Sequence, residues 1–447
     1  MRRRQLSPPQ VLAISILGLA VAGGLLLALP AAAAPGRHVS PLDAFFTSTS
    51  AVCVTGLIVI DTPKDLSPFG QTILLLLIQV GGLGYMTITA LVALALGKRI
   101  SLEERLSLQE TLNAYSSEGL LRFAGIVALM TLLFELAGTA LLSIRWMPQF
   151  GLRQGGFLAL FHAVSAFNNA GFSLFSDNLM GYRSDLLVNL TITGLIIAGG
   201  LGFFVLADLR RGRRWGRLSL HTRFVLVVTA MLIAGGTAGF YLFERANPQT
   251  LGGLGTGDAV LASYFHSVSA RTAGFNTVNL GAAAPATLFL LITLMFIGAS
   301  PGGTGGGVKT TTFGITMASL WATVHGQADT VIFKRRVAPA IVARAFLISL
   351  IAFLALNVVA IAILVTEGGA LDRVLFETTS AFGTVGLSTG DASGILSMAG
   401  GFSPVGKLLI MLMMFIGRAG PLTLAVAVAG RRPQQRIRYP EGKLIIG

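Results

Sequence analysis

The chain has 447 residues, of which 53% are hydrophobic and only 12% are charged. Because an ordinary soluble domain carries roughly 25% charged residues, this composition excludes a typical soluble enzyme and favours a single membrane domain. The formal net charge is +14, but the basic residues stand in short runs between apolar segments, which argues against a nucleic-acid-binding face. A single cysteine, Cys53, excludes an intrachain disulfide, and no Cys/His cluster has the spacing of a structural metal site.

Apolar stretches that could cross about 30 Å of hydrocarbon recur along the whole chain. The first, 11–29, follows three arginines and precedes four alanines, as a secretory signal would. It is longer than the usual apolar core of about 7–15 residues in a signal peptide, so we expect a retained helix. The predicted spans are residues 11–29, 69–96, 120–142, 186–207, 224–243, 286–296, 340–365 and 405–429.

Basic residues gather in the loops on one side of these spans, at residues 2–4, 98–122, 210–223, 334–344 and 431–443. By the positive-inside rule this side is cytoplasmic. An even number of spans then places both termini in the cytoplasm.

Each pair of spans is joined on the other side by a shorter, half-apolar stretch, at residues 42–50, 155–166, 259–270 and 371–381. Such a stretch is too short to cross the membrane and too apolar for a free loop. Since irregular backbone at membrane depth persists only where it lines protein or a water-filled cavity, we predict re-entrant half-helices. The units all begin and end on the same side, which disfavours a secondary transporter with inverted repeats.

The four re-entrant stretches carry one motif, with an aromatic start, a Ser-Ala pair and then a glycine. From Phe45, Phe161, Phe265 and Phe376 they read FFTSTSAVCVTGL, FHAVSAFNNAGFS, FHSVSARTAGFN and FETTSAFGTVGLS. Their glycines are 115, 103 and 112 residues apart, which predicts four units of about 110 residues. The third unit has one residue fewer between the Ser-Ala pair and the glycine.

Glycine lets a backbone turn through positive φ, and a ring of backbone carbonyls can replace the water shell of a potassium ion. The half-helices would point their partially negative C-terminal ends at such an ion, with Asp43, Asp258 and Asp372 as caps at their N-termini. The alternative is that the glycines are packing points between membrane helices. The predicted potassium filter consists of Val54, Thr55, Gly56, Asn169, Ala170, Gly171, Thr272, Ala273, Gly274, Thr384, Val385 and Gly386.

A glycine-rich run follows the sixth span and cannot continue a rigid helix, since glycine costs about 1 kcal/mol and proline about 3 kcal/mol relative to alanine. We interpret it as a flexible plug under the filter, with a structural kink as the alternative. A phosphate-binding loop is disfavoured because there is no GxxxxGK[ST] motif and no preceding strand. The gate residues are Gly298, Ser300, Pro301, Gly302, Gly303, Thr304, Gly305, Gly306, Gly307 and Lys309.

Arg418 lies within the last apolar run, where a charge costs at least ~2.5 kcal/mol and indicates a functional site unless the side chain snorkels to the cytoplasmic surface. We expect Arg271 to support its own loop by donating to carbonyls. His162 and His266 occupy the same place in two units and are interpreted as packing or hydrogen-bonding residues of the half-helices.

Four outer-helix, pore-loop and inner-helix units with one-glycine filters resemble the TrkH/TrkG/KtrB/HKT family of potassium transporters over essentially the whole chain. Only one span precedes the first pore loop, and the ending Pro440-Glu441-Gly442-Lys443 is similar to KtrB tails. Both features favour the KtrB branch. The resemblance implies an all-α polytopic membrane protein with four pseudo-symmetric units around a central pore. It also implies that the glycine-rich run is an intramembrane gate and that Arg418 lies below the filter.

The family resemblance places the units at residues 1–97, 98–209, 210–325 (with the gate loop) and 326–430, before a cytoplasmic tail at 431–447. The implied function is potassium uptake across a bacterial inner membrane, without enzymatic activity or an organic cofactor. Stimulation by sodium is left open. The implied partners are a second copy of the chain, membrane lipid and a cytosolic ring of nucleotide-binding KtrA-type subunits.

An integral-membrane enzyme such as a lipid transferase is the alternative class, and it would need paired acidic metal ligands facing a cavity. No DxxxD cluster lies inside the predicted spans. Glu135 and Asn357 are instead interpreted as helix-to-helix hydrogen-bonding residues.

Overall fold

The computed structural model describes residues 8–84, 120–212, 214–391 and 394–423. The arginines at 2–4, the second half of the predicted span 69–96, most of the basic loop 98–122 and the chain from residue 424 onward lie outside the described residues. All predicted filter and gate residues are described.

Four of the described helices are long and apolar enough to cross a membrane without interruption. They are the outer helices of the four units, namely α1 (Pro8–Leu27), α7 (Leu120–Phe150), α11 (Leu220–Glu244) and α15 (Pro339–Glu367). Each is followed by a short pore helix, namely α2 (Pro41–Val52), α8 (Leu152–Phe167), α12 (Thr256–Ser269) and α16 (Leu371–Gly383). The half-helices predicted from the sequence are thus confirmed.

The inner helices are shorter than the outer ones. They are α4 (Pro68–Leu83), α9 (Leu186–Leu201), α13 (Pro285–Phe296) and α17 (Pro404–Ala419). The prediction of a continuous helix at residues 186–207 was wrong. The chain bends by 99° after α9 and continues as α10 (Phe203–Arg211). A further helix, α14 (Thr310–Val324), follows the glycine-rich run.

Three of the inner helices end at a glycine with positive φ. Gly84 follows α4 with φ 77°, Gly202 follows α9 with φ 93°, and Gly420 follows α17 with φ 86°. Side chains rarely adopt this conformation, so glycine ends the helix there at little cost. The run Gly-Xaa-Xaa-Gly that precedes each break is a second repeat of the sequence, which the hydropathy pattern did not reveal.

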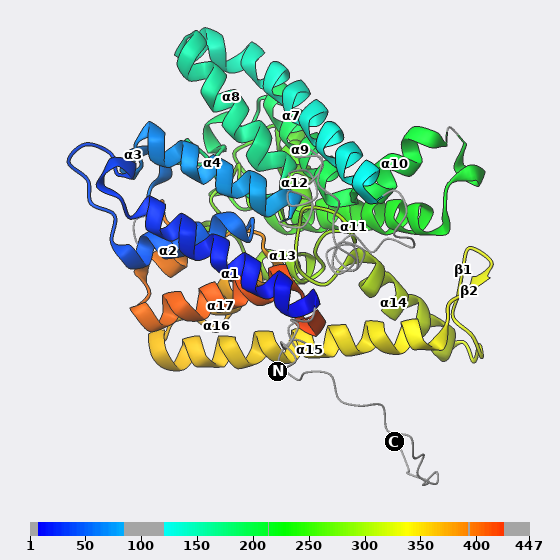
Figure 1. Cartoon of the computed structure of the whole chain (residues 1–447). Coiled ribbons are helices and arrows are strands. Elements are labelled where there is room, and N and C mark those ends of the chain that lie inside the picture. The colour runs from blue at the N-terminus through cyan, green and yellow to red at the C-terminus, as the bar shows by residue number, and fades with distance from the viewer. Residues whose placement is uncertain (1–7, 85–119, 213, 392–393, 424–447) are drawn as a thin grey trace, which may run out of the picture.

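The units form a closed ring, in which each pore helix is packed between its own outer helix and the inner helix of the preceding unit. Within the units, α1 contacts α2, α7 contacts α8, α11 contacts α12 and α15 contacts α16. Between the units, α4 contacts α8, α9 contacts α12, α13 contacts α16, and α17 contacts α2. The last of these contacts joins the fourth unit to the first (Figure 1).

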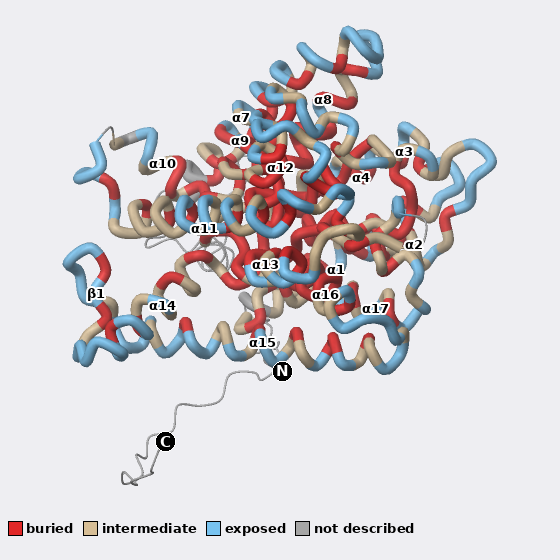
Figure 2. Tube along the Cα trace, turned by 180° about the vertical axis from the view of Figure 1, so that it is seen from behind, coloured by how far each residue is buried: buried red, intermediate tan, exposed pale blue. Residues whose placement is uncertain are grey.

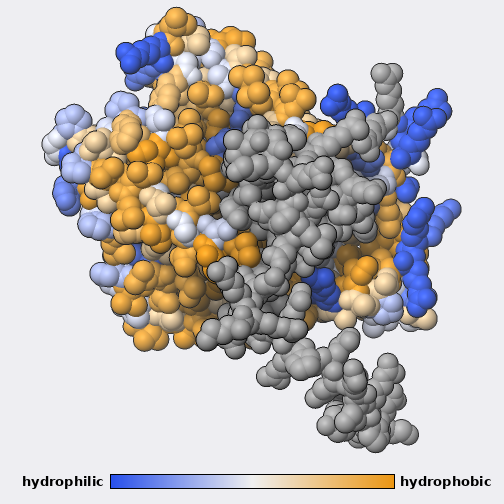
Figure 3. Space-filling model, in the orientation of Figure 1, coloured by the Kyte–Doolittle hydropathy of each residue, from blue (hydrophilic) through white to orange (hydrophobic). Residues whose placement is uncertain are grey.

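The core lies around the pore helices. Buried segments gather in the middle of the bundle near α12, α13 and α16, whereas the long helix α15 at its edge is largely exposed (Figure 2). Hydrophobic side chains cover much of the described outer surface, as the bilayer requires (Figure 3). In the first unit Phe46, not Phe45, is the fully buried counterpart of Phe161, so the predicted alignment was off by one residue there.

The remaining elements are short and lie in the loops. They are α3 (Thr62–Asp65), the 3₁₀ turns Pro30–Ala32, Met180–Tyr182, Trp215–Arg217, Leu280–Ala282 and Met398–Gly401, and strands β1 (Val331–Ile332) and β2 (Arg335–Arg336). The two strands pair antiparallel and form a basic hairpin between α14 and α15.

Candidate functional site: a central filter and the loop below it

The four filter strands share one backbone conformation. In every strand the motif glycine has positive φ, and so does the residue two positions before it. The φ values are 49° and 91° for Val54 and Gly56, 58° and 71° for Asn169 and Gly171, 73° and 78° for Thr272 and Gly274, and 49° and 94° for Thr384 and Gly386. Left-handed conformation is uncommon for non-glycine residues, and it is rarer still for a β-branched residue such as Thr384. Its recurrence at equivalent positions marks a functional constraint.

The glycines bring the four strands together in a closed ring. A Cβ atom on Gly56 would lie 2.4 Å from the carbonyl oxygen of Ala170 in the second unit. The equivalent distances are 2.7 Å from Gly171 to Ala273, 2.3 Å from Gly274 to Val385, and 2.2 Å from Gly386 to Thr55. Each glycine therefore faces the carbonyl that precedes the glycine of the next strand, and a side chain there would have to displace backbone.

The serine of each Ser-Ala pair fastens its own strand to the pore helix. The backbone N–H of Thr55, Ala170 and Val385 each donates to the carbonyl of that serine at 2.8 Å. In the third unit, which is one residue shorter, the N–H of Ala273 donates to Ser269 over four residues instead of five, at 2.9 Å. The missing residue is thus absorbed by a tighter turn.

The serine hydroxyls add a second bond to each strand, in two different ways. Ser50 and Ser380 accept from the N–H of Gly56 and Gly386, in both cases at 3.0 Å. In the other two units the hydroxyl donates to the carbonyl that follows the glycine, from Ser165 to Phe172 and from Ser269 to Phe275.

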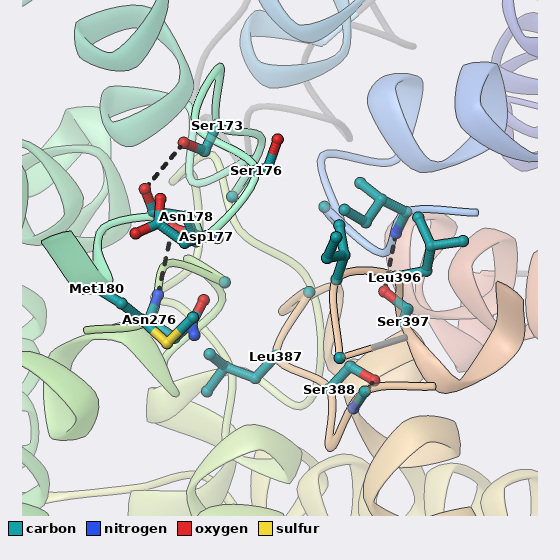
Figure 4. A pocket seen from close by; sticks show the side chains of 18 of the residues that line it. Ser173, Ser176, Asp177, Asn178, Met180, Asn276, Leu387, Ser388, Leu396 and Ser397 are labelled. Atoms are coloured by element: carbon teal, nitrogen blue, oxygen red, sulfur yellow. Dashed lines mark hydrogen bonds between the residues drawn. The ribbon is translucent and has the colours of Figure 1, made fainter. Parts of the chain in front are cut away.

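The outer ends of the strands open into a vestibule with about 710 Å³ of empty space, and all four motif glycines line its floor. Its walls come from polar loops of different units. Figure 4 shows Asn178 and Asn276 on one side and Ser388 and Ser397 on the other. The N–H of Asn276 donates to the Asn178 side chain at 3.4 Å, which joins the loops of the second and third units. This polar, open entrance leads to the four motif glycines.

The three predicted aspartate caps do not cap the pore helices. The N-cap residues of α2, α12 and α16 are Ser40, Gly255 and Ala370, and the aspartates lie in the first turn of each helix. The prediction of the capping residue was wrong because the helices begin earlier than the acidic residue. Asp43 instead accepts from Lys407 of α17 at 2.7 Å, which ties the first unit to the fourth.

The glycine-rich run lies directly against the inner ends of the filter strands. A Cβ on Gly305 would be 1.9 Å from Thr272 Oγ1, and one on Gly306 would be 2.5 Å from Thr384 Oγ1. The N–H of Gly306 donates to Thr384 Oγ1 at 2.9 Å. The side-chain amide of Asn169 lies 3.3 Å from Thr304 Oγ1. The predicted filter and gate residues are therefore in contact with each other.

The same loop is fastened to the broken end of α9 in the second unit. Ser300 N–H donates to Gly200 O at 2.9 Å, Thr304 N–H to Gly199 O at 3.2 Å, and Phe203 N–H to Gly302 O at 3.0 Å. Within the loop, Lys309 Nζ donates to Gly305 O at 2.6 Å. In the third unit, this folded loop thus takes the place of the lower half of a continuous inner helix.

Arg418 points inward from α17 and joins three units. Its guanidinium donates to the carbonyls of Thr304 in the gate loop and of Gly81 at the end of α4, and to Gly82 O at 3.3 Å. The charge is thus hydrogen-bonded below the filter instead of extending to the cytoplasmic surface.

The other polar residues behave in different ways. His162 contacts Leu158 O at 2.8 Å and Ser173 Oγ at 2.9 Å, and His266 contacts Ala262 O at 2.8 Å, so both are hydrogen-bonding residues as predicted. Arg271 is buried, and among the described residues its Nε has no hydrogen-bond partner, so the expected support of its loop stays a prediction.

Of the two isolated polar residues, only Glu135 bonds between helices. It accepts from Asn168 at 3.0 Å, whereas Asn357 donates to Phe353 O of its own helix. A side-chain amide in a helix can donate to the backbone carbonyl one turn earlier, so Asn357 needs no partner on another helix, which the sequence alone did not reveal.

Comparison with known proteins gives consistent matches. The TrkH family model, described as a cation transport protein, matches residues 21–438. The Ktr system potassium uptake protein B of Bacillus subtilis is 43% identical over 99% of this chain and 97% of its own length. The potassium/sodium uptake protein NtpJ of Enterococcus hirae is 36% identical over 100% of this chain and 98% of its own. The crystal structure of the potassium transporter TrkH from Vibrio parahaemolyticus matches with a TM-score of 0.75 and 19% identity, over 95% of this chain and 86% of that one, which shows the same fold.

Four helical units, each contributing a re-entrant pore helix and a glycine-containing strand to one central ring, define a multi-pass membrane protein of the cation-transporter class. The matched family is a family of cation transporters and not an enzyme family. The chain belongs to the TrkH family of cation transport proteins.

Proposed function

We propose that this chain is the pore-forming subunit of a potassium uptake system. The observation that carries the proposal is the closed ring in which each of Gly56, Gly171, Gly274 and Gly386 faces a carbonyl oxygen of the next strand. Four strands that expose backbone carbonyls around one axis can replace the hydration shell of a potassium ion, which one strand alone cannot do. The name of the Bacillus subtilis relative, a potassium uptake protein, supports the choice of ion.

In this proposal the ion enters from the polar vestibule and passes through the ring formed by the twelve filter residues. The pore helices α2, α8, α12 and α16 end at the ring, so the negative ends of their dipoles favour a cation there. No acidic side chain is required in the ring itself.

Below the ring, residues 298–309 act as the gate, and Arg418 holds this loop in place by hydrogen bonds. The support is that the loop contacts the inner ends of the third and fourth strands and is bonded both to α9 and to Arg418. Conduction then requires the loop to move away from Thr272 and Thr384.

The proposed setting is a bacterial inner membrane with both termini in the cytoplasm, as the distribution of basic residues indicates. The functional units are those at residues 1–97, 98–209, 210–325 and 326–430. We propose a homodimer regulated by a cytosolic ring of nucleotide-binding KtrA-type subunits, because one relative is named as part of a Ktr system. Sodium is proposed as a second candidate ion, since another relative is named as a potassium/sodium uptake protein.

The test is rubidium uptake by a cell that cannot grow on low potassium without a transporter. The chain is expressed with and without a KtrA-type subunit, and uptake is compared with that of cells carrying an empty vector. We expect uptake above the vector control, which increases with the partner and is competed by potassium. Absence of uptake in both cases, with the chain folded in the membrane, would contradict the proposal.

A further inference from the structure

Each pore helix carries one side chain directly behind its filter strand, three residues before the serine of the Ser-Ala pair. These side chains are Thr47, His162, His266 and Glu377, and all four are 0% exposed. Equivalent positions with such different chemistry imply that the four strands are supported differently. Only the fourth unit has a carboxyl group there.

In the second and third units the histidine reaches the chain just after the motif glycine. His162 Nε2 lies 2.9 Å from the hydroxyl of Ser173, two residues after Gly171. His266 Nε2 accepts from Thr277 N–H at 3.4 Å. In the first unit the Thr47 hydroxyl has no hydrogen-bond partner among the described residues.

Glu377 makes two bonds, one from each carboxyl oxygen. Its Oε2 accepts from the hydroxyl of Ser388, two residues after Gly386, at 2.6 Å. Its Oε1 accepts from the N–H of Ala399, in the outer loop of the fourth unit, at 3.0 Å. The Ser388 oxygen also accepts from the N–H of Met398 at 2.9 Å, so the pore helix, the filter strand and the outer loop meet at this carboxyl group.

The outer loop then extends this support to the first unit. Ile58, two residues after Gly56, donates from its N–H to Ser397 Oγ at 2.9 Å and accepts from Ser397 N–H at 3.0 Å. Leu396, Ser397 and Ser388 line the same side of the vestibule (Figure 4). The first strand, behind which Thr47 makes no hydrogen bond, is therefore also held at its outer end by the loop that Glu377 anchors.

Carboxyl chemistry is required for this arrangement. The two donors, the Ser388 hydroxyl and the Ala399 N–H, approach different oxygens, and a buried carboxyl group is tolerated only when its oxygens are bonded. A glutamine has one acceptor oxygen and would place its NH₂ group against one of these donors. The described residues include no salt bridge to Glu377, so neutral donors alone hold it.

We propose that Glu377 is a positioning residue for ion selection. Through Ser388 it fixes the outer end of the fourth filter strand, and through the loop at Ser397 it fixes the outer end of the first. These two strands are neighbours, because Gly386 faces Thr55 O. Since ion discrimination by carbonyls depends on their number and placement, loosening two adjacent strands changes which ion the ring fits. This inference rests on the proposed potassium conduction.

The experiment compares Glu377→Gln, Ser388→Ala and the control Thr47→Val in proteoliposomes, with potassium and sodium fluxes measured over a range of concentrations. Thr47→Val changes the equivalent position of the first unit, where the hydroxyl has no partner. For Glu377→Gln we expect the potassium-to-sodium selectivity to fall about tenfold and the KM for potassium to rise, with a smaller change in maximal rate. Ser388→Ala should change the selectivity and the KM for potassium in the same direction as Glu377→Gln, and Thr47→Val should leave both of them unchanged.

A rescue variant separates positioning from general destabilisation. Glu377→His places at this site the side chain that bonds Ser173 in the second unit, and it should recover part of the potassium selectivity lost in Glu377→Gln. Wild-type selectivity and KM in both Glu377→Gln and Ser388→Ala would overturn the inference, as would a loss confined to the amount of folded protein. If the unmodified chain conducts no potassium in the same vesicles, it is the proposed function that fails.

Discussion

The filter strands and the gate loop lie against each other, yet they are fastened in opposite ways. Each filter strand is bonded to the serine of its own pore helix, as Thr55 is to Ser50 and Val385 to Ser380. The gate loop is bonded mainly to other units, to the end of α9 in the second and to Arg418 of the fourth. A segment held by its neighbours can be released when those neighbours move, while the serine bonds within each unit keep the filter strands attached to their own pore helices.

The comparison also shows where the fourfold symmetry matters. The left-handed backbone recurs in all four strands, whereas the inner helices end at a positive-φ glycine in three units and give way to the loop in the third. Ion binding by a ring needs equivalent strands around one axis. In the proposed function a single segment is enough to block the passage, which agrees with a loop that is present only in the third unit.

The largest expected effect comes from a side chain in the ring. Gly386→Ser and Gly56→Ser force positive φ on a residue that disfavours it and place a Cβ 2.2 and 2.4 Å from neighbouring carbonyl oxygens. We expect potassium selectivity over sodium to fall at least about tenfold, since strain and displacement together exceed 1.4 kcal/mol. Fluxes of both ions in proteoliposomes measure this. Gly401→Ser is the matched control, because nothing lies within 4 Å of its Cβ position.

Unaltered selectivity in both filter variants would remove these glycines from the ion path. A selectivity loss of the same size in Gly401→Ser would show that the effect does not depend on the position of the glycine in the ring.

The second effect concerns the gate. Deletion of residues 300–306 removes the segment bonded to Gly199, Gly200 and Thr384, and it leaves the serine bonds of the filter strands intact. We expect potassium flux per folded molecule to rise several-fold and to depend less on the proposed cytosolic partner, with selectivity retained. If the loop were only a structural kink, the deletion would lower the amount of folded protein without raising normalised flux.

A smaller increase in potassium flux is expected when only the hydrogen bonds of Arg418 to the loop are removed. Arg418→Gln loses the charge-assisted bonds to Thr304 O and Gly81 O, each worth roughly 1.5–3 kcal/mol, but keeps the loop itself. Flux should therefore rise less than in the deletion, and potassium affinity should stay unchanged. Arg344→Gln, at an exposed position of α15, is the control. Lower flux in Arg418→Gln, with intact dependence on the partner, would show that the guanidinium supports the open path instead.

The repeated parts of this candidate site could be proposed from local motifs. Glycine after a Ser-Ala pair in four copies pointed to the strands, and the density of glycine near residue 305 pointed to the loop. Both signals depend on backbone freedom, which only glycine has in this degree. The contact between loop and strands was expected from the family resemblance, and the order of the units around the ring emerged only from the structure.

The features that the sequence did not predict depend on backbone φ angles and on hydrogen-bond partners that are distant in the sequence. Hydropathy favoured one helix at residues 186–207 because Gly202 reads as an ordinary small residue of a membrane helix. Gly202 has positive φ, the chain bends there, and a Cβ on it would lie 2.6 Å from Pro301 O of the gate loop. Glu377 was missed because its partners Ser388 and Ala399 are 11 and 22 residues away, in loops without periodicity.

The smallest effect tests the single bond that joins the two regions in the fourth unit, from Gly306 N–H to Thr384 Oγ1 at 2.9 Å. Thr384→Ser keeps the acceptor, whereas Thr384→Val removes it and preserves the β-branched shape at φ 49°. A neutral hydrogen bond contributes about 0.5–1.5 kcal/mol, so we expect flux through the valine variant to rise about two- to tenfold at unchanged selectivity. The serine variant should behave like the unmodified chain. Flux in proteoliposomes is the measurement, without the proposed cytosolic partner, because we expect the proposed gate to stay closed in its absence. If selectivity changed in Thr384→Val while flux did not, the hydroxyl would belong to the filter and not to its attachment to the gate.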